Sequence, residues 1–468
     1  MAYQAPVWEN GGSPAISAEN LNAMSQALEG AQVLYGNSAP TSATKGAVGQ
    51  YYLVVMSNSQ GDYPLYQCVG ISGGSYVWKL FEYTSKYISA SVAQLLGLSQ
   101  GATVDDALFV LGSPTAGKGV LRVSCVDVYG RPVSGCIVQV GSTWGSSTKV
   151  GAVTFDLNSG THSVSIRSPI DYGLGTQTKS VTILPGESVT LSVTIEDSLS
   201  GAQEFRVTGS VAMAAFSDRV TSADAFCVGG GGSGAAARRY PSGSNRSLAA
   251  GGAGGYTKMK TNINLDLPIV LTVGAGGSAV AAANSQNIGA NGNSGGTTKI
   301  VDMLGTTIIS ASGGSGGQYT NGSYLTGANG GSGSGGVSEI NALYVGASGQ
   351  DGANGAQAGN SNAPGGTGQG TTTRLWGSSS GELFCSAGAS AIASNDHSGA
   401  IAGTPGSGGG TAYAENYINV TGDLRAGDAT TYGSGGGALA AIDDESSGSY
   451  YSGAGKQGLI VFRWEVSA

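Results

Sequence analysis

The side chains best suited to bond-breaking chemistry are carboxylates near the C-terminal end. Asp443, Asp444 and Glu445 are adjacent, and Asp396, Asp423 and Asp428 precede them. Two carboxylates flanking a glycosidic bond can hydrolyse it. Adjacent carboxylates on an exposed turn, however, are ordinarily solvated charge or a loose Ca²⁺ site. We therefore expect no catalytic site here and keep polysaccharide cleavage as the alternative.

The sequence contains few of the residues that other catalytic chemistries need. The chain has two histidines, His162 and His397, which leaves a Ser/His/Asp arrangement poorly supplied. The run GTPGSGGG at 403–410 lacks the Lys-Ser/Thr ending of a phosphate-binding loop. We accordingly predict that the protein is not an enzyme and that it uses no cofactor, and we assign no metal ligands.

Binding chemistry is better supplied, by aromatic and amide side chains in five segments of the glycine-rich half. These segments are 318–325, 339–345, 371–384, 411–425 and 441–451. Tyr and Trp offer large contact areas at low entropy cost, and Asn adds adaptable hydrogen bonds. Some of these rings can instead serve as local core. The candidate binding residues are Tyr319, Tyr324, Tyr344, Trp376, Tyr413, Asn416, Tyr417, Tyr432, Tyr450 and Tyr451.

Charge and hydropathy exclude several kinds of partner. The net charge is -8, and only 11% of the residues are charged. Phosphate binding needs clustered Lys and Arg, so we expect no nucleic-acid partner. No window reaches the roughly 18 apolar residues of a membrane span. The start, MAYQAPVWENGG, lacks the pattern of a signal peptide, so we expect synthesis in a cytoplasm and release by a route such as lysis.

The five cysteines form no CxxC pair, which argues against a disulfide framework or a common zinc motif. Cys125 and Cys136 lie symmetrically about the turn at 129–132. They either face each other across a hairpin or are two small buried apolar residues.

The first 115 residues predict two short helical stretches around a small β region. Residues 14–33 follow a possible Ser17 cap, with apolar side chains at near-helical spacing. Residues 48–82 contain three aromatic and β-branched runs, which predict an antiparallel meander. Residues 86–111 again show helical spacing and predict a linker or stalk.

Residues 118–196 predict a β-sandwich spacer. The first strands, GVLRVSCVDV and CIVQV, alternate as a hairpin would. Further strands are predicted at 150–156, 162–167, 178–184 and 188–195. The region resembles carboxypeptidase-regulatory-like and collagen-adhesin B-type modules, with Cys136 in their small-residue position. The matching residues are Val126, Asp127, Gly130, Pro132, Val133, Gly135 and Val138.

The C-terminal half is dominated by glycine: 59 of the 83 glycines follow residue 200. Many recur at every third position, the repeat of an extended helix with three residues per turn. One face of such a helix has no side chain, and neighbouring backbones can approach it. Collagen needs longer repeats and more proline. The periodic glycines are Gly289, Gly292, Gly295, Gly327, Gly330, Gly333, Gly336, Gly346, Gly349, Gly352, Gly355, Gly403, Gly406 and Gly409.

Strand-like segments run through this half, at 267–273, 298–310 and 459–466, which a disordered linker would lack. The strand ADAFCV at 223–228 and the closing LIVFRW at 459–464 bracket the region, as if they pair to close a domain. We therefore predict an ordered domain of packed glycine-rich helices.

The bracketing strands, the run VGGGGSG at 228–234 and the closing 453–464 resemble the glycine-rich tips of bacteriophage tail fibres. In T-even-like long tail fibres, such tips are adhesins in which polyglycine II helices form a sandwich and variable loops meet the receptor. The segment VWENGGSPAISAENLN also resembles the N-termini of tail and baseplate fibre proteins. T-even-like tips are separate proteins that cap a fibre, whereas this chain carries its own stalk, which puts oligomeric state and attachment in doubt.

The resemblance implies a mainly β, multidomain fibre. Its parts would be an attachment segment with a helix (1–36), a small β domain (37–84), a helical linker (85–115), a β-sandwich spacer (116–197) and a receptor-binding tip (198–468). The implied partners are a protein or glycan receptor on a bacterial surface and other phage tail or baseplate proteins. The implied state is a homotrimer in the virion tail. The alternatives are a tail-associated depolymerase, a purely structural spike and a bacterial surface adhesin.

Overall fold

The computed structural model describes residues 34–36, 40–44, 51–54, 65–72, 75–80, 118–199, 202–239, 246–265, 267–282, 288–338, 351–357, 363–395, 399–418, 422–443 and 448–466. The expected mainly-β fold is confirmed: within these ranges the helical pieces are two 3₁₀ turns, η1 (Ile170–Tyr172) and η2 (Leu375–Gly377). No helix in the described part of the chain is long and apolar enough to span a membrane. The helices predicted at 14–33 and 86–111 lie outside the described residues.

The chain divides into two compact units. The first comprises Met1–Leu121, Phe155–Thr161 and Thr182–Val189, and the second comprises Arg122–Thr154, His162–Val181 and Thr190–Ala468. In the first unit, the predicted meander is present as β2 (Tyr51–Val54), β3 (Leu65–Ser72) and β4 (Ser75–Leu80), which pair antiparallel in that order. A further strand, β1 (Leu34–Gly36), pairs parallel with β2.

The predicted spacer forms two sheets. One has the order β10-β9-β6-β7 and the other β11-β5-β8. The strands are β5 (Lys118–Val126), β6 (Ile137–Val140), β7 (Thr143–Ser146), β8 (Ala152–Asn158), β9 (Gly160–Arg167), β10 (Thr176–Ile183) and β11 (Ser188–Thr194).

The expected hairpin between the first two spacer strands is wrong, because β5 and β6 belong to different sheets. Both strands bury alternate side chains, such as Val123 and Val138. Alternation predicts which face of a strand is buried but not which strand is its neighbour. The connection turns at Asp127, whose carboxylate accepts hydrogen bonds from the backbone N–H groups of Tyr129 (2.8 Å) and Arg131 (2.9 Å).

At one end of the glycine-rich domain, which we call the near end, two four-stranded sheets enclose an apolar core. The first has the order β12-β32-β14-β17 and the second β13-β18-β21-β22. The predicted pairing of the bracketing strands is confirmed, because β14 and β32 are antiparallel partners with Val228 opposite Leu459. The strands are β12 (Glu204–Val207), β13 (Val211–Ala214), β14 (Val220–Val228), β17 (Thr257–Lys260), β18 (Ile269–Thr272), β21 (Thr298–Asp302), β22 (Thr307–Ala311) and β32 (Leu459–Val466).

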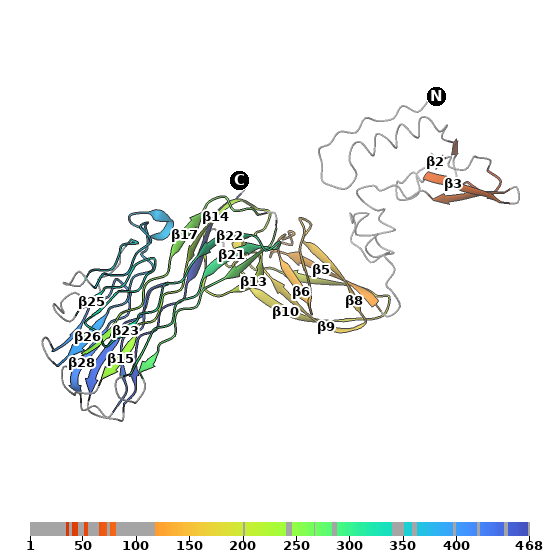
Figure 1. Cartoon of the computed structure of the whole chain (residues 1–468). Coiled ribbons are helices and arrows are strands. Elements are labelled where there is room, and N and C mark those ends of the chain that lie inside the picture. Colours follow the sequence, from red (N-terminus) through yellow and green to blue (C-terminus); the bar gives the residue numbers. More distant parts are fainter. Residues whose placement is uncertain are drawn as a thin grey trace. The chain divides into compact units, whose positions relative to one another are not determined.

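At the opposite end, the far end, short strands form four sheets: β19-β31-β29, β20-β15-β30-β28, β23-β16-β26-β27 and β24-β25. β15, β23, β26 and β28 mark this end in Figure 1. The strands are β15 (Ala236–Arg239), β16 (Arg246–Ala249), β19 (Ala281–Ala282), β20 (Gly289–Ala290), β23 (Tyr319–Thr320), β24 (Tyr324–Leu325), β25 (Val337–Ser338), β26 (Ala391–Ser394), β27 (Gly399–Ala402), β28 (Tyr413–Ile418), β29 (Leu424–Arg425), β30 (Leu439–Asp443) and β31 (Tyr450–Tyr451).

Alanines hold the far-end sheets together. Ala237 of β15 and Ala440 of β30 pack on Ala249 of β16 and Ala393 of β26, so the two four-stranded sheets meet through small side chains. The alternate residues of the same strands point outward to the two smaller sheets. The result is a stack of four thin layers.

Between the two ends run glycine-rich segments that are not strands, which we call rods. Residues 229–235 show their rule. The N–H groups of Gly229, Gly232 and Ala235 donate to one neighbour, at Tyr256, Ala253 and Ala250, over 2.9, 2.9 and 3.0 Å. Those of Gly230 and Ser233 donate to Gly296 and Asn293 of a second neighbour, and those of Gly231 and Gly234 donate to Lys456 and Gly453 of a third. The direction in which the backbone N–H groups point thus repeats every three residues, as polyglycine II geometry requires.

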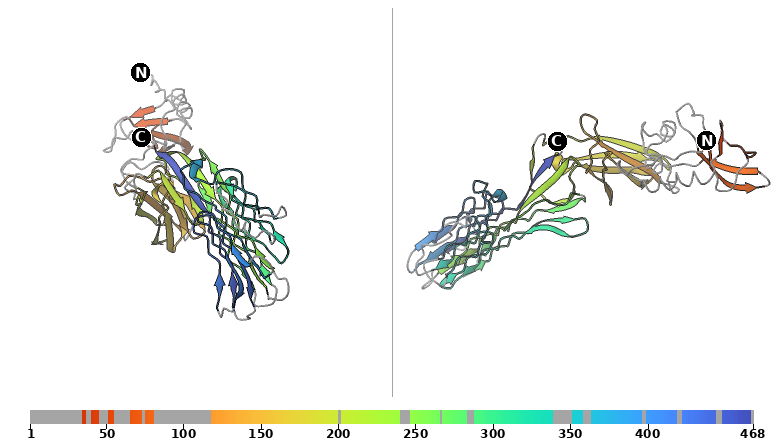
Figure 2. Two further views of the ribbon diagram at one scale, coloured as in Figure 1. Left: turned by 90° about the vertical axis from the view of Figure 1, so that its left-hand side faces the viewer. Right: turned by 90° about the horizontal axis from the view of Figure 1, so that it is seen from above.

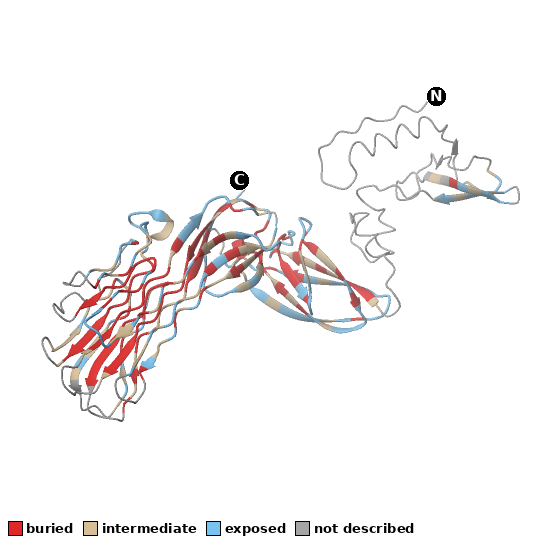
Figure 3. Cartoon of the chain, viewed as in Figure 1, coloured by how far each residue is buried: buried red, intermediate tan, exposed pale blue. Residues whose placement is uncertain are grey.

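Backbone crowds this rod from every side. A methyl group placed on Gly229, Gly230 or Gly231 would meet the carbonyl oxygen of Ser312, Ala275 or Ser434. The period of three predicts one side-chain-free face per helix. This inner rod instead meets neighbouring backbone on all of its faces, so it needs small residues at every position. Figure 3 shows buried residues continuing through the rods from end to end.

The periodic glycines do not share one environment. Most of them face the backbone of a neighbouring segment: Gly292, Gly295, Gly327, Gly330, Gly333, Gly336, Gly355 and Gly409. Gly289 lies under the Tyr319 ring, and Gly352 occupies a turn with a φ of +80°. Gly403 and Gly406 donate their N–H groups to Ser390 and Ala387. Gly346 and Gly349 lie outside the described residues.

Within the second unit, a buried ion pair joins the spacer to the glycine-rich domain. Asp171 of η1 is fully buried and accepts hydrogen bonds from Arg219 Nε (2.7 Å) and from the N–H (2.8 Å) and hydroxyl (2.6 Å) of Ser217. Arg219 also contacts Asp197 at 2.7 Å and lies over the Tyr172 ring. Both carboxylate oxygens of Asp171 therefore have hydrogen-bond partners, as a buried charge requires, and these contacts stabilise the junction.

Candidate functional site

The far end collects most of the predicted binding residues. The chain passes there from β15 to β16, β19 to β20, β23 to β24, β26 to β27, β28 to β29 and β30 to β31. The two views in Figure 2 show these strand ends grouped on one side of the glycine-rich domain. The candidates that lie on these strands are Tyr319, Tyr324, Tyr413, Asn416, Tyr417, Tyr450 and Tyr451.

These residues differ in how much surface they offer. Tyr324 is 50% exposed and is the most open of those whose side chains the structure describes. Tyr319 and Tyr451 are partly buried. Tyr450 is fully buried, with the Arg238 guanidinium 4.6 Å above its ring, and it belongs to the core between layers. It therefore cannot touch a large partner unless the layers open.

β28 contributes a polar edge. Asn416 is partly buried, and its Nδ2 donates to the Ser394 carbonyl of β26 at 2.7 Å, which ties two layers together. Burial raises the pKa of Tyr413, and the neighbouring Glu415 carboxylate raises it further. For Tyr417 only the strand backbone is described, and Tyr344 lies outside the described residues.

Trp376 and Tyr432 lie at the near end, apart from the other candidates. They pack on the cluster that contains Phe226 and Phe384. Trp376 donates its indole N–H to Glu204 at 3.0 Å, and the Arg463 guanidinium lies 4.4 Å from its ring. These contacts make Trp376 part of the local packing. Sequence spacing could not reveal which end of the domain a connecting segment reaches.

Two arginines at the far end, Arg239 and Arg246, were not predicted from the sequence. Arg239 donates to the backbone carbonyl of Arg246 at 3.2 Å, and Arg246 donates to the Ser323 hydroxyl at 3.1 Å, in the turn that precedes Tyr324. The available signal was their position at the facing ends of two alanine-containing strands, AARR (236–239) and RSLA (246–249), in a chain with few charges. These side chains brace the turn that carries the exposed tyrosine.

The described carboxylates of this half have structural partners. Asp423 accepts the Ser449 N–H at 3.1 Å, and Asp428 accepts the Ala454 N–H at 2.7 Å. Among the residues that the structure describes, no group of three His, Cys, Asp or Glu side chains is placed to hold a metal ion. Asp396, His397, Asp444 and Glu445 lie outside the described residues, as does the side chain of Asp443.

Comparison with known proteins adds a family. No curated protein matches the chain. Among solved structures, it is similar to the Bacillus anthracis TIE protein at 10% identity, with a TM-score of 0.17, over 45% of this chain and 46% of that one. The chain thus matches less than half of that protein's length, and this low score carries no conclusion about fold or function. The family model described as a glycine-rich domain matches residues 207–465. Because that match covers more than half of the sequence, the chain belongs to the glycine-rich domain family.

Proposed function

We propose that the protein is a bacteriophage tail fibre or adhesin whose far end attaches to a receptor on the bacterial surface. In this proposal, residues 1–36 join other tail or baseplate proteins, and the fibre is a homotrimer in the virion. The observation that supports the proposal best is the division of labour in the glycine-rich domain. The rods hold one another through backbone hydrogen bonds, and six connections between strands lie at the far end.

This division suits recognition of a changing surface. Rod residues are constrained by neighbouring backbone at nearly every position, as the crowding around Gly230 and Gly231 shows. Loops on a rigid scaffold are where binding residues concentrate, and the far-end connections join strands that continue into the rods. A receptor site can therefore change there without loss of the fold.

Tyr324 tests the proposal. The fluorescently labelled full chain is added to a panel of bacterial strains, and bound fluorescence is measured against protein concentration. We expect saturable binding to some strains, weakened about tenfold or more by Tyr324→Ala because an exposed aromatic anchor is lost.

The matched control is Tyr129→Ala, since Tyr129 is a more exposed tyrosine in the spacer, at 80%. Binding to none of the strains would contradict the proposed function. Equal effects of the two substitutions would contradict the far-end site. Sedimentation of the unlabelled chain tests the trimer independently.

A further inference from the structure

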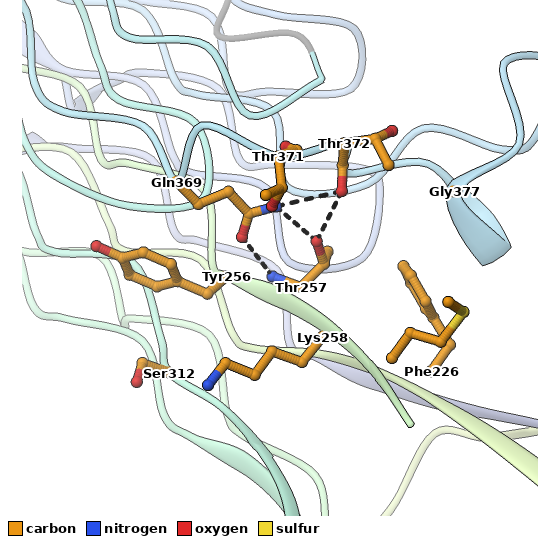
Figure 4. A pocket seen from close by; sticks show the side chains of 10 residues that line it. Phe226, Tyr256, Thr257, Lys258, Ser312, Gln369, Thr371, Thr372 and Gly377 are labelled. Carbon is orange, nitrogen blue, oxygen red and sulfur yellow. Dashed lines mark hydrogen bonds between the residues drawn. The ribbon is translucent and has the colours of Figure 1, made fainter. Parts of the chain in front are cut away.

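A pocket of about 690 Å³ lies at the near end of the glycine-rich domain, away from the proposed receptor end (Figure 4). Its walls are β17 with the preceding Tyr256, residue Ser312 after β22, and the segment 369–377. This volume suits a ligand of one or two sugar units. None of the predicted binding residues lines it.

One wall of the pocket is fixed by the Gln369 amide. Its oxygen accepts the Thr257 N–H at 2.9 Å. Its nitrogen donates to the Thr257 hydroxyl at 2.7 Å and to the carbonyls of Thr371 and Thr372 at 3.3 Å each. The Thr257 hydroxyl in turn donates to the Thr372 carbonyl at 3.2 Å. This network, drawn in Figure 4, holds the segment 369–372 against β17 without using the hydroxyl of Thr371.

The facing groups are free to bind. Tyr256 and Lys258 are two residues apart and extend to the same side of β17, toward Ser312 (Figure 4). Within the described residues, neither the Tyr256 hydroxyl nor the Lys258 ammonium has a hydrogen-bond or ion-pair partner. Ser312 and Thr371 are exposed and add two hydroxyl groups. No carboxylate lines the pocket, so Lys258 gives it a positive charge.

We propose that this pocket binds an acidic sugar, a hexuronic acid unit of a surface polysaccharide. The Tyr256 ring would cover one face of the sugar, and the hydroxyls of Ser312 and Thr371 would bond its hydroxyls. Lys258 would pair with its carboxylate. A neutral sugar would leave the ammonium uncompensated, and a bare anion would leave the aromatic and hydroxyl groups unused. The site is separate from the far end, so either can fail without the other.

The test compares three probes on the full chain by saturation-transfer NMR and titration: methyl β-D-glucuronide, methyl β-D-glucoside and inorganic phosphate. We expect the glucuronide to bind about fivefold more tightly than the glucoside, the size of effect of one partly exposed charge pair. Lys258→Met should remove that preference, and Tyr256→Leu should weaken both sugars. Lys258 is exposed and Tyr256 is partly buried, and the thermal midpoint of each variant verifies its folding.

Lys260→Met is the matched control because Lys260 lies on the same strand, is also exposed and does not line the pocket. It should leave binding of all three probes unchanged. Equal affinity for the two sugars would overturn the proposal, as would full competition by phosphate at the same concentration. An equal loss in the Lys258 and Lys260 variants would show a general charge effect and would also overturn it.

Discussion

The spacer and the glycine-rich domain both have to provide hydrogen-bond partners for buried backbone N–H and C=O groups. They do so in opposite ways. In the spacer, the interior consists of side chains, such as the fully buried Val123, Val138 and Ile166. Backbone hydrogen bonds stay within each sheet, between neighbours in one plane. In the rod 229–235, backbone bonds point in three directions, and neighbouring backbone occupies the space that a side chain on Gly229, Gly230 or Gly231 would need.

The difference decides what each region can tolerate. A side-chain core can lose a methyl group at a modest cost, because its neighbours relax partly into the space. A core made of backbone has nothing to rearrange, since moving one rod disturbs its hydrogen bonds to several others. Ordering so much glycine also costs entropy, which only the collective bonding of the rods offsets. The rods should therefore respond to single atoms more sharply than the spacer does.

Adding one methyl group to a rod is the severest test of this contrast. In Gly231→Ala, the new carbon would meet the Ser434 carbonyl, and we expect a loss of more than about 3 kcal/mol in unfolding free energy, or no folded protein. Chemical denaturation followed by circular dichroism measures the loss. The control is Gly209→Ala, whose new carbon would have no atom within 4 Å. If both variants unfold at the wild-type denaturant concentration, backbone contact between rods does not limit stability.

Breaking the junction between the two regions should have the next largest effect. Arg219→Ala leaves the fully buried Asp171 carboxylate without its cation, which costs about 3 kcal/mol. We expect a lower thermal midpoint by calorimetry and separate transitions for spacer and rods. Arg425→Ala removes a pair whose side chains are both about half exposed, and we expect a loss below about 0.5 kcal/mol. Similar midpoints for the two variants would mean that the junction does not couple the regions.

The rods were largely predictable, because short sequence patterns show both the period of three and the bracketing strands. The pairing of β14 with β32 followed from the two apolar runs, 223–228 and 459–464. What could not be predicted was the number of neighbours around each rod. A glycine at Gly231 looks the same in sequence whether one face or all faces of its helix are covered.

The candidate site was predicted less completely for a related reason. Tyr319, Tyr324 and Tyr413 did fall at one end, because the segments that hold them connect neighbouring rods. Trp376 fell at the other end, since its position depends on whether an odd or even number of rods precedes it. Burial of Tyr450 depends on the layer that covers it, and β31 is only two residues long. Such a short strand leaves no periodic signal in the sequence.

Acid offers the mildest test, because titratable groups anchor the spacer but are absent from the rod 229–235. Burial acts to raise the pKa of Asp127, but hydrogen bonds from Arg131 and Tyr129 outweigh it and lower that pKa below its ordinary value of 3.8. A carboxylate with a lowered folded pKa stabilises the fold above its unfolded pKa, and that stability is lost as pH falls through the folded value. We expect the thermal midpoint of the wild type to fall more steeply below about pH 4 than that of Asp127→Asn. Parallel curves would show that this turn contributes nothing to acid sensitivity, and the contrast between a charge-anchored spacer and uncharged rods would then rest on packing alone.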